Sequence, residues 1–353
     1  MGRAVIDVPR VPLRRFERLS RSPGLTPERA EYTINHEMDS VGSLRVAGLA
    51  LFGAAFLFGQ GPHTRDGHPD LQGLWTNVTI TPLERPRDLA GKAFFTAEEA
   101  AAYEKKIVDQ RGGDEDTPAA LADPTIWWER GTHVVSTLRT SLIVDPADGR
   151  MPPLLPEAQK RMQEARAYTR MHPADGPEDR SLQERCVMSG TTGPPMLSGP
   201  YNNNIQIVET PGAIMMTIEM IHDVRVIPMD GRPHLPSNVR LWMGDPRGHW
   251  EGDTLVVDTT NFTTKTHFRG ADENLHLIER FKFTDAETLL YQFTVDDPTA
   301  FSKQWTAEIP MHRSAGPMYE FACHEGNRAL PNMLRIAREA EKAPSAQAPK
   351  SSK

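Results

Sequence analysis

The feature that most constrains the fold is a series of short β-patterned segments between residues 203 and 323, joined by turn sequences. "NNIQIVE" and "AIMMTIEMIHDVRVI" flank Thr-Pro-Gly, and "HWEGDTLVVDTTNF" holds two strand patterns around a Glu-Gly turn. "HLIERFKF", "TLLYQFTV" and "KQWTAEIPM" continue as a meander, which "MYEFAC" is expected to close. About eight to ten antiparallel strands without intervening helices must close into a barrel or pack as a sandwich to protect their edges.

The pattern therefore predicts a mainly β protein, an antiparallel β-barrel with a few peripheral helices and long loops. Helices are expected over residues 96–111, 154–170 and 328–342. Residues 172–204 are rich in Gly and Pro, and a loop of this length is usually functional or draped over the domain. "GLW" at residues 73–75 is similar to the G-x-W start of lipocalin-like barrels, which implies a barrel of that kind.

The N-terminal part of the chain predicts an export signal. Residues 46–59 form an uncharged apolar block, shorter than the roughly 20 residues of a membrane span and typical of a signal-peptide core. We expect a leader over residues 1–60, with Met38 as a candidate start, a single β-rich domain over 70–342 and a disordered tail over 343–353. The protein is then exported, to the periplasm or as a secreted protein, with no integral membrane span.

Charge and cysteine content narrow the partners and the compartment. The chain has 40 Lys and Arg against 47 Asp and Glu, a net charge of -7, which argues against nucleic acid as a partner. Cys186 and Cys323 could form one disulfide in an oxidising compartment or remain two buried thiols in a reducing one. Export favours the disulfide.

Four segments together resemble a family of exported bacterial proteins whose activity is not established. They are "GHWEGDTLVVDTTNF", "PYNNN", "EMIHDVRVIPMDGRPHLP" and "YEFACHEGN". The resemblance covers residues 70 to 340 and implies export and a β-rich fold. It implies no reaction, so the chemistry has to be inferred from individual residues.

Several familiar catalytic signatures are missing from the sequence. There is no G-x-S-x-G, G-x-x-x-x-G-K, H-E-x-x-H, C-x-x-C or G-x-G-x-x-G. This disfavours an ordinary serine hydrolase, a P-loop NTPase, a zincin and a nicotinamide dehydrogenase. We expect no cofactor.

The candidate chemistry lies in one apolar segment, residues 213–227, which is expected to form a single strand. Because side chains alternate along a strand, Glu219, Asp223 and Arg225 share one face, here called the charged face, and His222 lies on the other. Asp223 and Arg225 are two residues apart on the charged face, so a salt bridge between them is the plain expectation.

Three hypotheses follow for these candidate catalytic residues. In the first, His222 is a general acid or base in an apolar pocket, oriented by a carboxylate from another strand, for which Asp258, Glu279 and Glu308 are available. In the second, the charged face points into the barrel and binds a polar substrate. In the third, the charged face is solvated and His222 is a satisfied core residue.

Other residues are candidates for substrate binding. Tyr201 and Asn204 precede a strand, where amides at a barrel mouth would bind sugars or carbonyls, although Asn also forms plain turns. His324 follows a cysteine and is either a site residue or part of a last strand anchored by the disulfide. His63 and His68 are expected in a mobile segment beside the leader, and no metal site is predicted.

The leading functional hypothesis is an exported enzyme that uses acid–base side chains on a small, partly apolar molecule. Lyase, isomerase or hydrolase chemistry would suit, since each needs only proton transfer and charge stabilisation. The first alternative is a non-catalytic, lipocalin-like protein that carries a hydrophobic ligand in the barrel. The second is a structural protein of the cell envelope.

Overall fold

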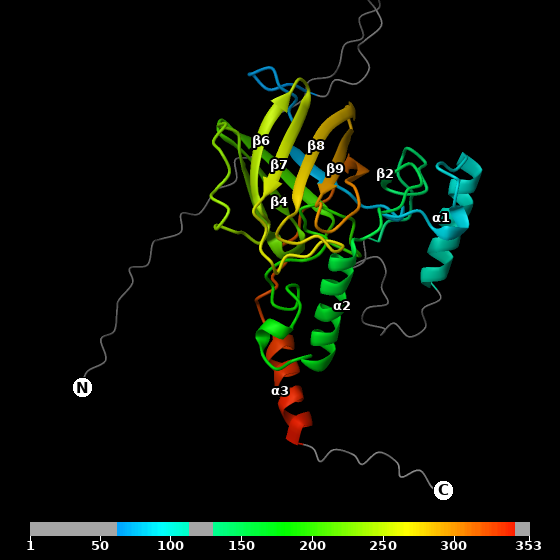
Figure 1. Cartoon of the computed structure of the whole chain (residues 1–353). Coiled ribbons are helices and arrows are strands. Elements are labelled where there is room, and N and C mark those ends of the chain that lie inside the picture. The colour runs from blue at the N-terminus through cyan, green and yellow to red at the C-terminus, as the bar shows by residue number, and fades with distance from the viewer. Residues whose placement is uncertain (1–61, 113–129, 343–353) are drawn as a thin grey trace, which may run out of the picture. The chain divides into compact units, whose positions relative to one another are not determined.

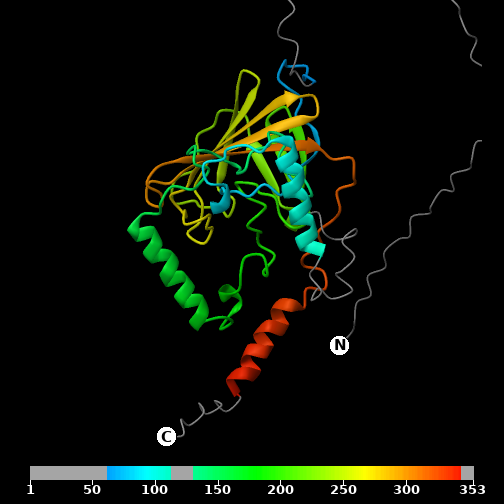
Figure 2. The ribbon, with the colours of Figure 1, turned by 90° about the vertical axis from the view of Figure 1, so that its right-hand side faces the viewer.

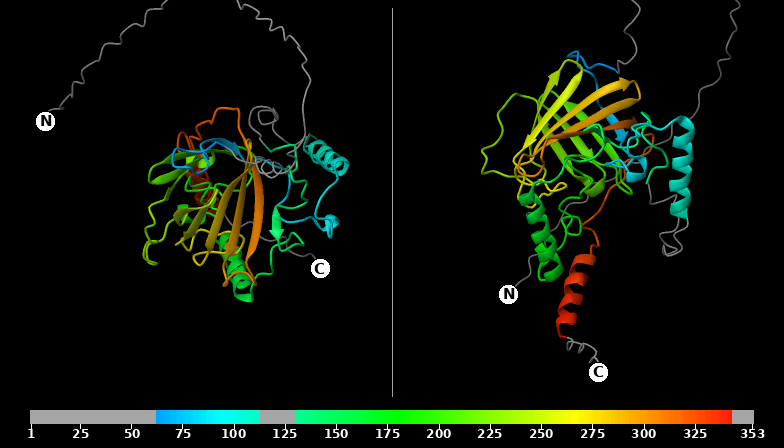
Figure 3. Two further views of the ribbon diagram at one scale, coloured as in Figure 1. Left: turned by 90° about the horizontal axis from the view of Figure 1, so that it is seen from above. Right: turned by 45° about the vertical axis from the view of Figure 1, so that its right-hand side comes forward.

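The computed structural model describes residues 62–112 and 130–342. The predicted leader and the predicted tail lie outside these residues. Nine strands follow one another in an antiparallel sheet that curls into a nearly closed barrel (Figure 1), as the sequence predicts. Seen from above in Figure 3, the strands curve around a common interior. The closer likeness to lipocalins stays a prediction.

Each strand of the barrel pairs with its neighbours antiparallel, and a short tenth strand, β2, adds to β10 at one point of the wall. Around the barrel the order is β5 (Val224–Pro228), β4 (Ala213–Ile218), β3 (Asn204–Thr210), β1 (Gly73–Thr76), β10 (Trp305–Arg313), β9 (Thr288–Asp296), β8 (His276–Asp285), β7 (Thr254–Thr260) and β6 (Asp245–Glu251), with β2 at Ile143–Asp145.

The predicted turns join these strands where expected. Pro211 and Gly212 connect β3 to β4, and Gly252 and Asp253 connect β6 to β7. Gly252 has φ +57°, a left-handed conformation that glycine adopts without steric cost and that two-residue hairpins require. The strands β8, β9 and β10 form the predicted meander.

Two strand predictions are wrong. The segment 213–227 is not one strand, because the 3-10 turn η3 (Met220–His222) reverses the chain and β5 runs back along β4. Ile221 and His222 have φ of 64° and 50°, which a strand cannot contain. The segment 318–323, expected to close the sheet, has no strand conformation.

The sheet ends in a seam between β5 and β6. Nine strands that alternate in direction leave the first and the last running the same way, so these two edges meet in parallel and no ladder joins them. They still approach closely: a Cβ atom added to Gly248 on β6 would lie 2.8 Å from the Ile227 Cγ2 on β5. Glycine at this position therefore lets the edges come together.

The interior of the barrel is a packed hydrophobic core. The largest fully buried side chains point inward from strands all around the wall and from the connections that cover it, among them Trp75, Phe281, Tyr291, Phe293 and Trp305. Protein interiors are packed as densely as organic crystals, so side chains of this size fill the centre of the barrel.

Three α-helices within the described residues confirm the predicted helices: α1 (Ala97–Gly112), α2 (Pro156–Met171) and α3 (Ala329–Lys342). Thr96 caps α1 as expected, since its Oγ1 accepts from the Glu99 N–H at 3.3 Å while the Glu99 Oε2 accepts from the Thr96 N–H at 2.8 Å. Figures 1 and 2 show α2 and α3 projecting from the same end of the barrel. Among the described helices, none is both long and apolar enough to cross a membrane.

Candidate functional site

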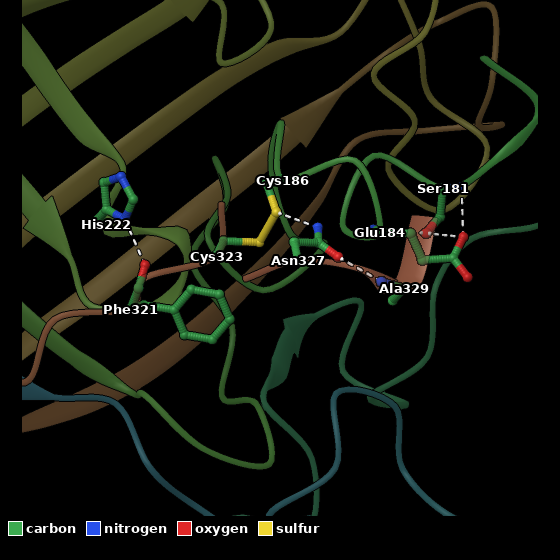
Figure 4. Close-up of a disulfide and its surroundings, with 8 residues drawn as sticks. All are labelled: Ser181, Glu184, Cys186, His222, Phe321, Cys323, Asn327 and Ala329. Carbon is green, nitrogen blue, oxygen red and sulfur yellow. Dashed lines mark hydrogen bonds between the residues drawn. A yellow bond between two sulfur atoms is a disulfide. The ribbon is translucent and has the colours of Figure 1, made fainter. Parts of the chain in front are cut away.

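The structure brings five of the predicted site residues together at one end of the barrel, where Cys186 and Cys323 form the expected disulfide (Figure 4). We call this the disulfide end. It contains the start of β3, the η3 turn and the C-terminal segment, and the five residues are Tyr201, Asn204, Glu219, His222 and Asp223.

The Glu219 carboxylate links three segments of the disulfide end through hydrogen bonds. Its Oε2 accepts from the Asn204 Nδ2 at 2.8 Å, and its Oε1 accepts from the Tyr319 N–H at 2.9 Å. The Glu219 side chain is buried. Its two oxygens are thus used to hold the C-terminal segment and the start of β3 against the η3 turn.

His222 lies on the surface of the disulfide end. Its side chain is exposed, and its Nδ1 lies 2.7 Å from the backbone oxygen of Phe321 (Figure 4), so the ring holds the segment that leads to the disulfide. This placement contradicts the expectation of an acid or base inside an apolar pocket. His222 also does not fit the third hypothesis, which made it a core residue.

Asp223 and Arg225 do not form the expected salt bridge. Arg225 points into the barrel, as the second hypothesis expected, but its guanidinium is paired with Glu279 on β8. Asp223 is half-buried beside Thr192, and burial raises the pKa of its carboxyl to about 6. Its Oδ2 is buried without a hydrogen bond from the described residues.

The Arg225–Glu279 pair belongs to a sealed internal network. The Arg225 Nη1 donates to the Glu279 Oε1 at 3.0 Å, and the Tyr291 hydroxyl donates to the same oxygen at 2.8 Å. The Met196 N–H in turn donates to the Tyr291 hydroxyl at 3.1 Å. All three side chains are almost fully buried, so this network braces the core and does not face a substrate.

The three remaining candidates, Glu308, His324 and Asp258, lie apart from this network. The Glu308 Oε1 on β10 accepts from the Gln292 Nε2 at 2.9 Å, and its side chain is half-buried in the sheet. His324 follows the disulfide and is exposed.

Asp258 is part of a chain of acids and histidines on the outer wall of the barrel. Its Oδ2 lies 2.7 Å from the His276 Nε2, and its Oδ1 lies 3.0 Å from the His234 Nε2. The His234 Nδ1 lies 3.2 Å from the Asp245 Oδ2. The hydrogen bond with Asp258 raises the pKa of His276, and the same bond lowers the pKa of Asp258. The contacts of His234 hold the loop 229–244 against β6 and β7.

A cleft opens at the opposite end of the barrel, which we call the turn end, beside the β3–β4 turn. It is a cavity of about 610 Å³ that spans the seam, with Met229 from the β5 side and His249 and Trp250 from β6. The lining is completed by Thr64, Asp66, His68, Gln72, Glu209, Thr210, Pro211 and Ile214.

Glu209 is the carboxylate best placed for chemistry in this cleft. It stands near the end of β3, where the Leu71 N–H donates to its Oε1 at 2.7 Å, while its Oε2 accepts no hydrogen bond from the described residues. Burial raises the pKa of Glu209; the Leu71 hydrogen bond opposes this, and the charge of Asp70 adds to it. A fixed carboxyl with one available oxygen and a raised pKa is suited to donate and accept protons.

The opposite wall of the cleft carries a stacked aromatic pair. The His68 ring lies parallel to the Trp250 ring, with 4.9 Å between centroids and 4° between planes. His68 belongs to a closed turn in which the Asp70 N–H donates to the Pro62 oxygen at 2.7 Å. The expectation that the segment around His68 is mobile stays a prediction. Neither ring nitrogen of His68 hydrogen-bonds to another described residue.

Sequence reasoning missed every ionisable group of the cleft. Its walls come from the turn at 62–72, the β3–β4 hairpin, the end of β5 and the edge strand β6, which are far apart in the sequence. A local pattern cannot bring them together, and the one available signal is the acidic Glu209 near the end of a strand whose other residues carry no charge.

Among the described residues, no group of three or more His, Cys, Asp and Glu side chains is arranged to hold a metal ion. The fold and the cleft define a nearly closed antiparallel β-barrel protein with a packed core and a ligand-sized cavity at one end. Comparison of the chain with models of protein families, with curated proteins and with solved structures finds no match.

Proposed function

We propose that the protein is an exported enzyme that performs acid–base chemistry on a small, partly apolar molecule, with Glu209 as the proton donor and acceptor. The observation that carries this proposal is the Glu209 carboxyl itself: it lines a cavity of about 610 Å³, and burial raises its pKa. A titratable group with a perturbed pKa in a concave pocket is a recognised mark of a functional site.

The surroundings of Glu209 suit proton transfer. The Leu71 N–H fixes one carboxyl oxygen, so the other can be presented to a bound molecule in a constant position. His68 and His249 line the same cavity, and their imidazole rings can donate or accept hydrogen bonds there. Ile214, Met229 and Pro211 supply apolar surface for the rest of the substrate.

Export is supported by the Cys186–Cys323 disulfide, because disulfides persist in oxidising compartments. The carrier alternative in its lipocalin-like form has less support, since large side chains fill the barrel where such a ligand would lie. The remaining alternative is a carrier that binds its ligand in the cleft, and an experiment has to distinguish this carrier from an enzyme.

Turnover of a complex mixture of small molecules tests the proposal. The full chain is incubated with a microbial metabolite extract, and compounds that disappear or form are followed by mass spectrometry. We expect conversion by the wild type, its loss in Glu209→Gln, which keeps the size of the side chain, and full conversion by Glu325→Gln, an exposed position at the disulfide end. Equal conversion by Glu209→Gln would contradict the role of Glu209. Compounds that are depleted by binding, with no product formed, would make the protein a carrier.

A further inference from the structure

The charge balance of the cleft indicates what kind of molecule it accepts. Asp66 and Glu209 both line the cavity, and no lysine or arginine among the described residues does. Asp70, beside the cleft, adds negative charge that acts on Glu209. A concave site with charges of one sign and low-dielectric walls concentrates ligands of the opposite sign.

The uncharged residues of the cleft lining indicate a second property of the molecule that it accepts. Trp250 contributes an indole ring, one face of which the His68 ring covers, and aromatic faces attract ammonium groups, most strongly those of tryptophan. Ile214, Met229 and Pro211 form an apolar surface beside these polar groups. The cleft therefore offers one place for a cation and another for a hydrocarbon.

From these features we infer that the cleft binds a small organic amine, with its ammonium group at the carboxylates of Glu209 and Asp66 and its apolar part against Ile214 and Met229. This inference rests on the proposed function and names its substrate class. A neutral or anionic molecule of the same shape gains nothing from the carboxylates and binds more weakly.

Binding of an amine has a consequence for the protons of the site. Burial and the charge of Asp70 disfavour the ionised form of Glu209, and an ammonium ion beside it relieves both effects. The pKa of Glu209 falls when the amine binds, so the complex releases a proton over the pH range between the two pKa values. The ionised Glu209 in the complex is then a base, ready to accept a proton from the substrate.

Three probes of the same shape and different charge test the inference on the full chain: phenethylamine, 2-phenylethanol and 3-phenylpropanoate. Their affinities are measured by isothermal titration calorimetry in two buffers with different ionisation enthalpies, which also counts the protons exchanged. For the wild type we expect the amine to bind on the order of tenfold more tightly than the alcohol, as a desolvated ammonium contact would give, and to release protons. The anion should bind most weakly.

Variants of the cleft residues test whether the preference for the amine and the proton release arise at the cleft. Glu209→Gln and Asp66→Asn should each reduce the preference for the amine, and Glu209→Gln should abolish proton release, whereas Glu325→Gln should behave as the wild type. Three results would each overturn the inference. They are equal affinities for amine and alcohol, no binding of any probe, and a preference for the amine that survives in the variant with both Glu209→Gln and Asp66→Asn. The measurement needs no turnover, so amine binding without conversion would overturn the enzyme proposal alone, and conversion of a neutral molecule without amine binding would overturn the substrate class alone.

Discussion

Arg225 and Glu279 face each other across the inside of the barrel, although their strands, β5 and β8, are not neighbours in the sheet. The pair is bidentate, the two side chains are 1% and 0% exposed, and the Tyr291 hydroxyl completes the bonding of the carboxylate. Replacing only one member of such a buried ion pair leaves the other as a buried charge without a partner. A single substitution therefore costs more folding free energy than the pair itself contributes.

Loss of Arg225 alone should therefore destabilise the protein strongly. We expect Arg225→Met to lower the free energy of unfolding by about 3–5 kcal/mol, the range found when one partner of a buried pair is removed. The double variant Arg225→Met with Glu279→Gln should lose less than the sum of the two single changes. Chemical denaturation of the three variants measures this, and additive losses would show that the two residues act independently.

The Asp223 carboxyl should destabilise the folded protein at high pH. Its pKa is raised to about 6 in the folded protein by burial, against about 3.9 for the free side chain, so the folded state holds the proton more tightly than the unfolded state. Its contribution to stability falls as the pH rises from about 4 through 6. Asp223→Asn should thus raise the melting temperature at pH 8 and change it little at pH 4. Asp253→Asn, at an exposed turn, is the control, and a gain of the same size at both pH values would contradict the assignment.

The disulfide should stabilise the protein and hold the C-terminal segment. The sequence separation of 137 residues gives on the order of 4–5 kcal/mol in the chain-entropy model, which is an upper bound. The double variant Cys186→Ala with Cys323→Ala should lose up to this amount in chemical denaturation. Residues 314–328 should also become susceptible to trypsin at Arg328 in the folded protein, since non-covalent contacts such as those to Glu219 and His222 then hold this segment without the covalent link. Equal stability with and without reductant would rule this role out.

The contact between His276 and Asp258 should stabilise the protein in a limited pH window. The raised pKa of His276 makes its contribution complete below about pH 6.5 and lost as the pH rises through the folded value. The lowered pKa of Asp258 makes its contribution present above about pH 4 and lost on further acidification. His276→Asn should cost a few tenths to about 1 kcal/mol at pH 5.5 and less at pH 9, because the pair is partly exposed. His267→Asn, at an exposed position, should show no such difference between the two pH values.

The sequence predicted the parts of the fold that depend on local pattern. Alternating apolar residues and the turns at Pro211-Gly212 and Gly252-Asp253 were enough to infer β3, β4 and the meander. The η3 turn escaped prediction because Ile221 is β-branched, and such residues rarely adopt positive φ. Contacts distant in sequence impose it, among them the Glu219 N–H bonded to the Asn204 oxygen at 3.0 Å.

Candidate site residues were identified by type but not by environment. The sequence predicts Glu219, Asp223 and Arg225 on one face of a strand, whereas the η3 turn separates Glu219 from the other two and Arg225 pairs with a residue 54 positions away. The cleft residues Glu209 and His68 could not be grouped in advance, since the distance between them is set by the curvature of the sheet and the folding of the chain before β1.

The seam between β5 and β6 gives the barrel a mechanical property that a fully bonded wall would lack. A barrel whose two edge strands are not hydrogen-bonded to each other widens and twists more easily than a closed one. Its edges can move past each other without breaking hydrogen bonds of the sheet. The cleft lies across this seam, with Met229 on one side and Trp250 on the other. We therefore expect the width of the cleft to adjust at little cost to the rest of the sheet.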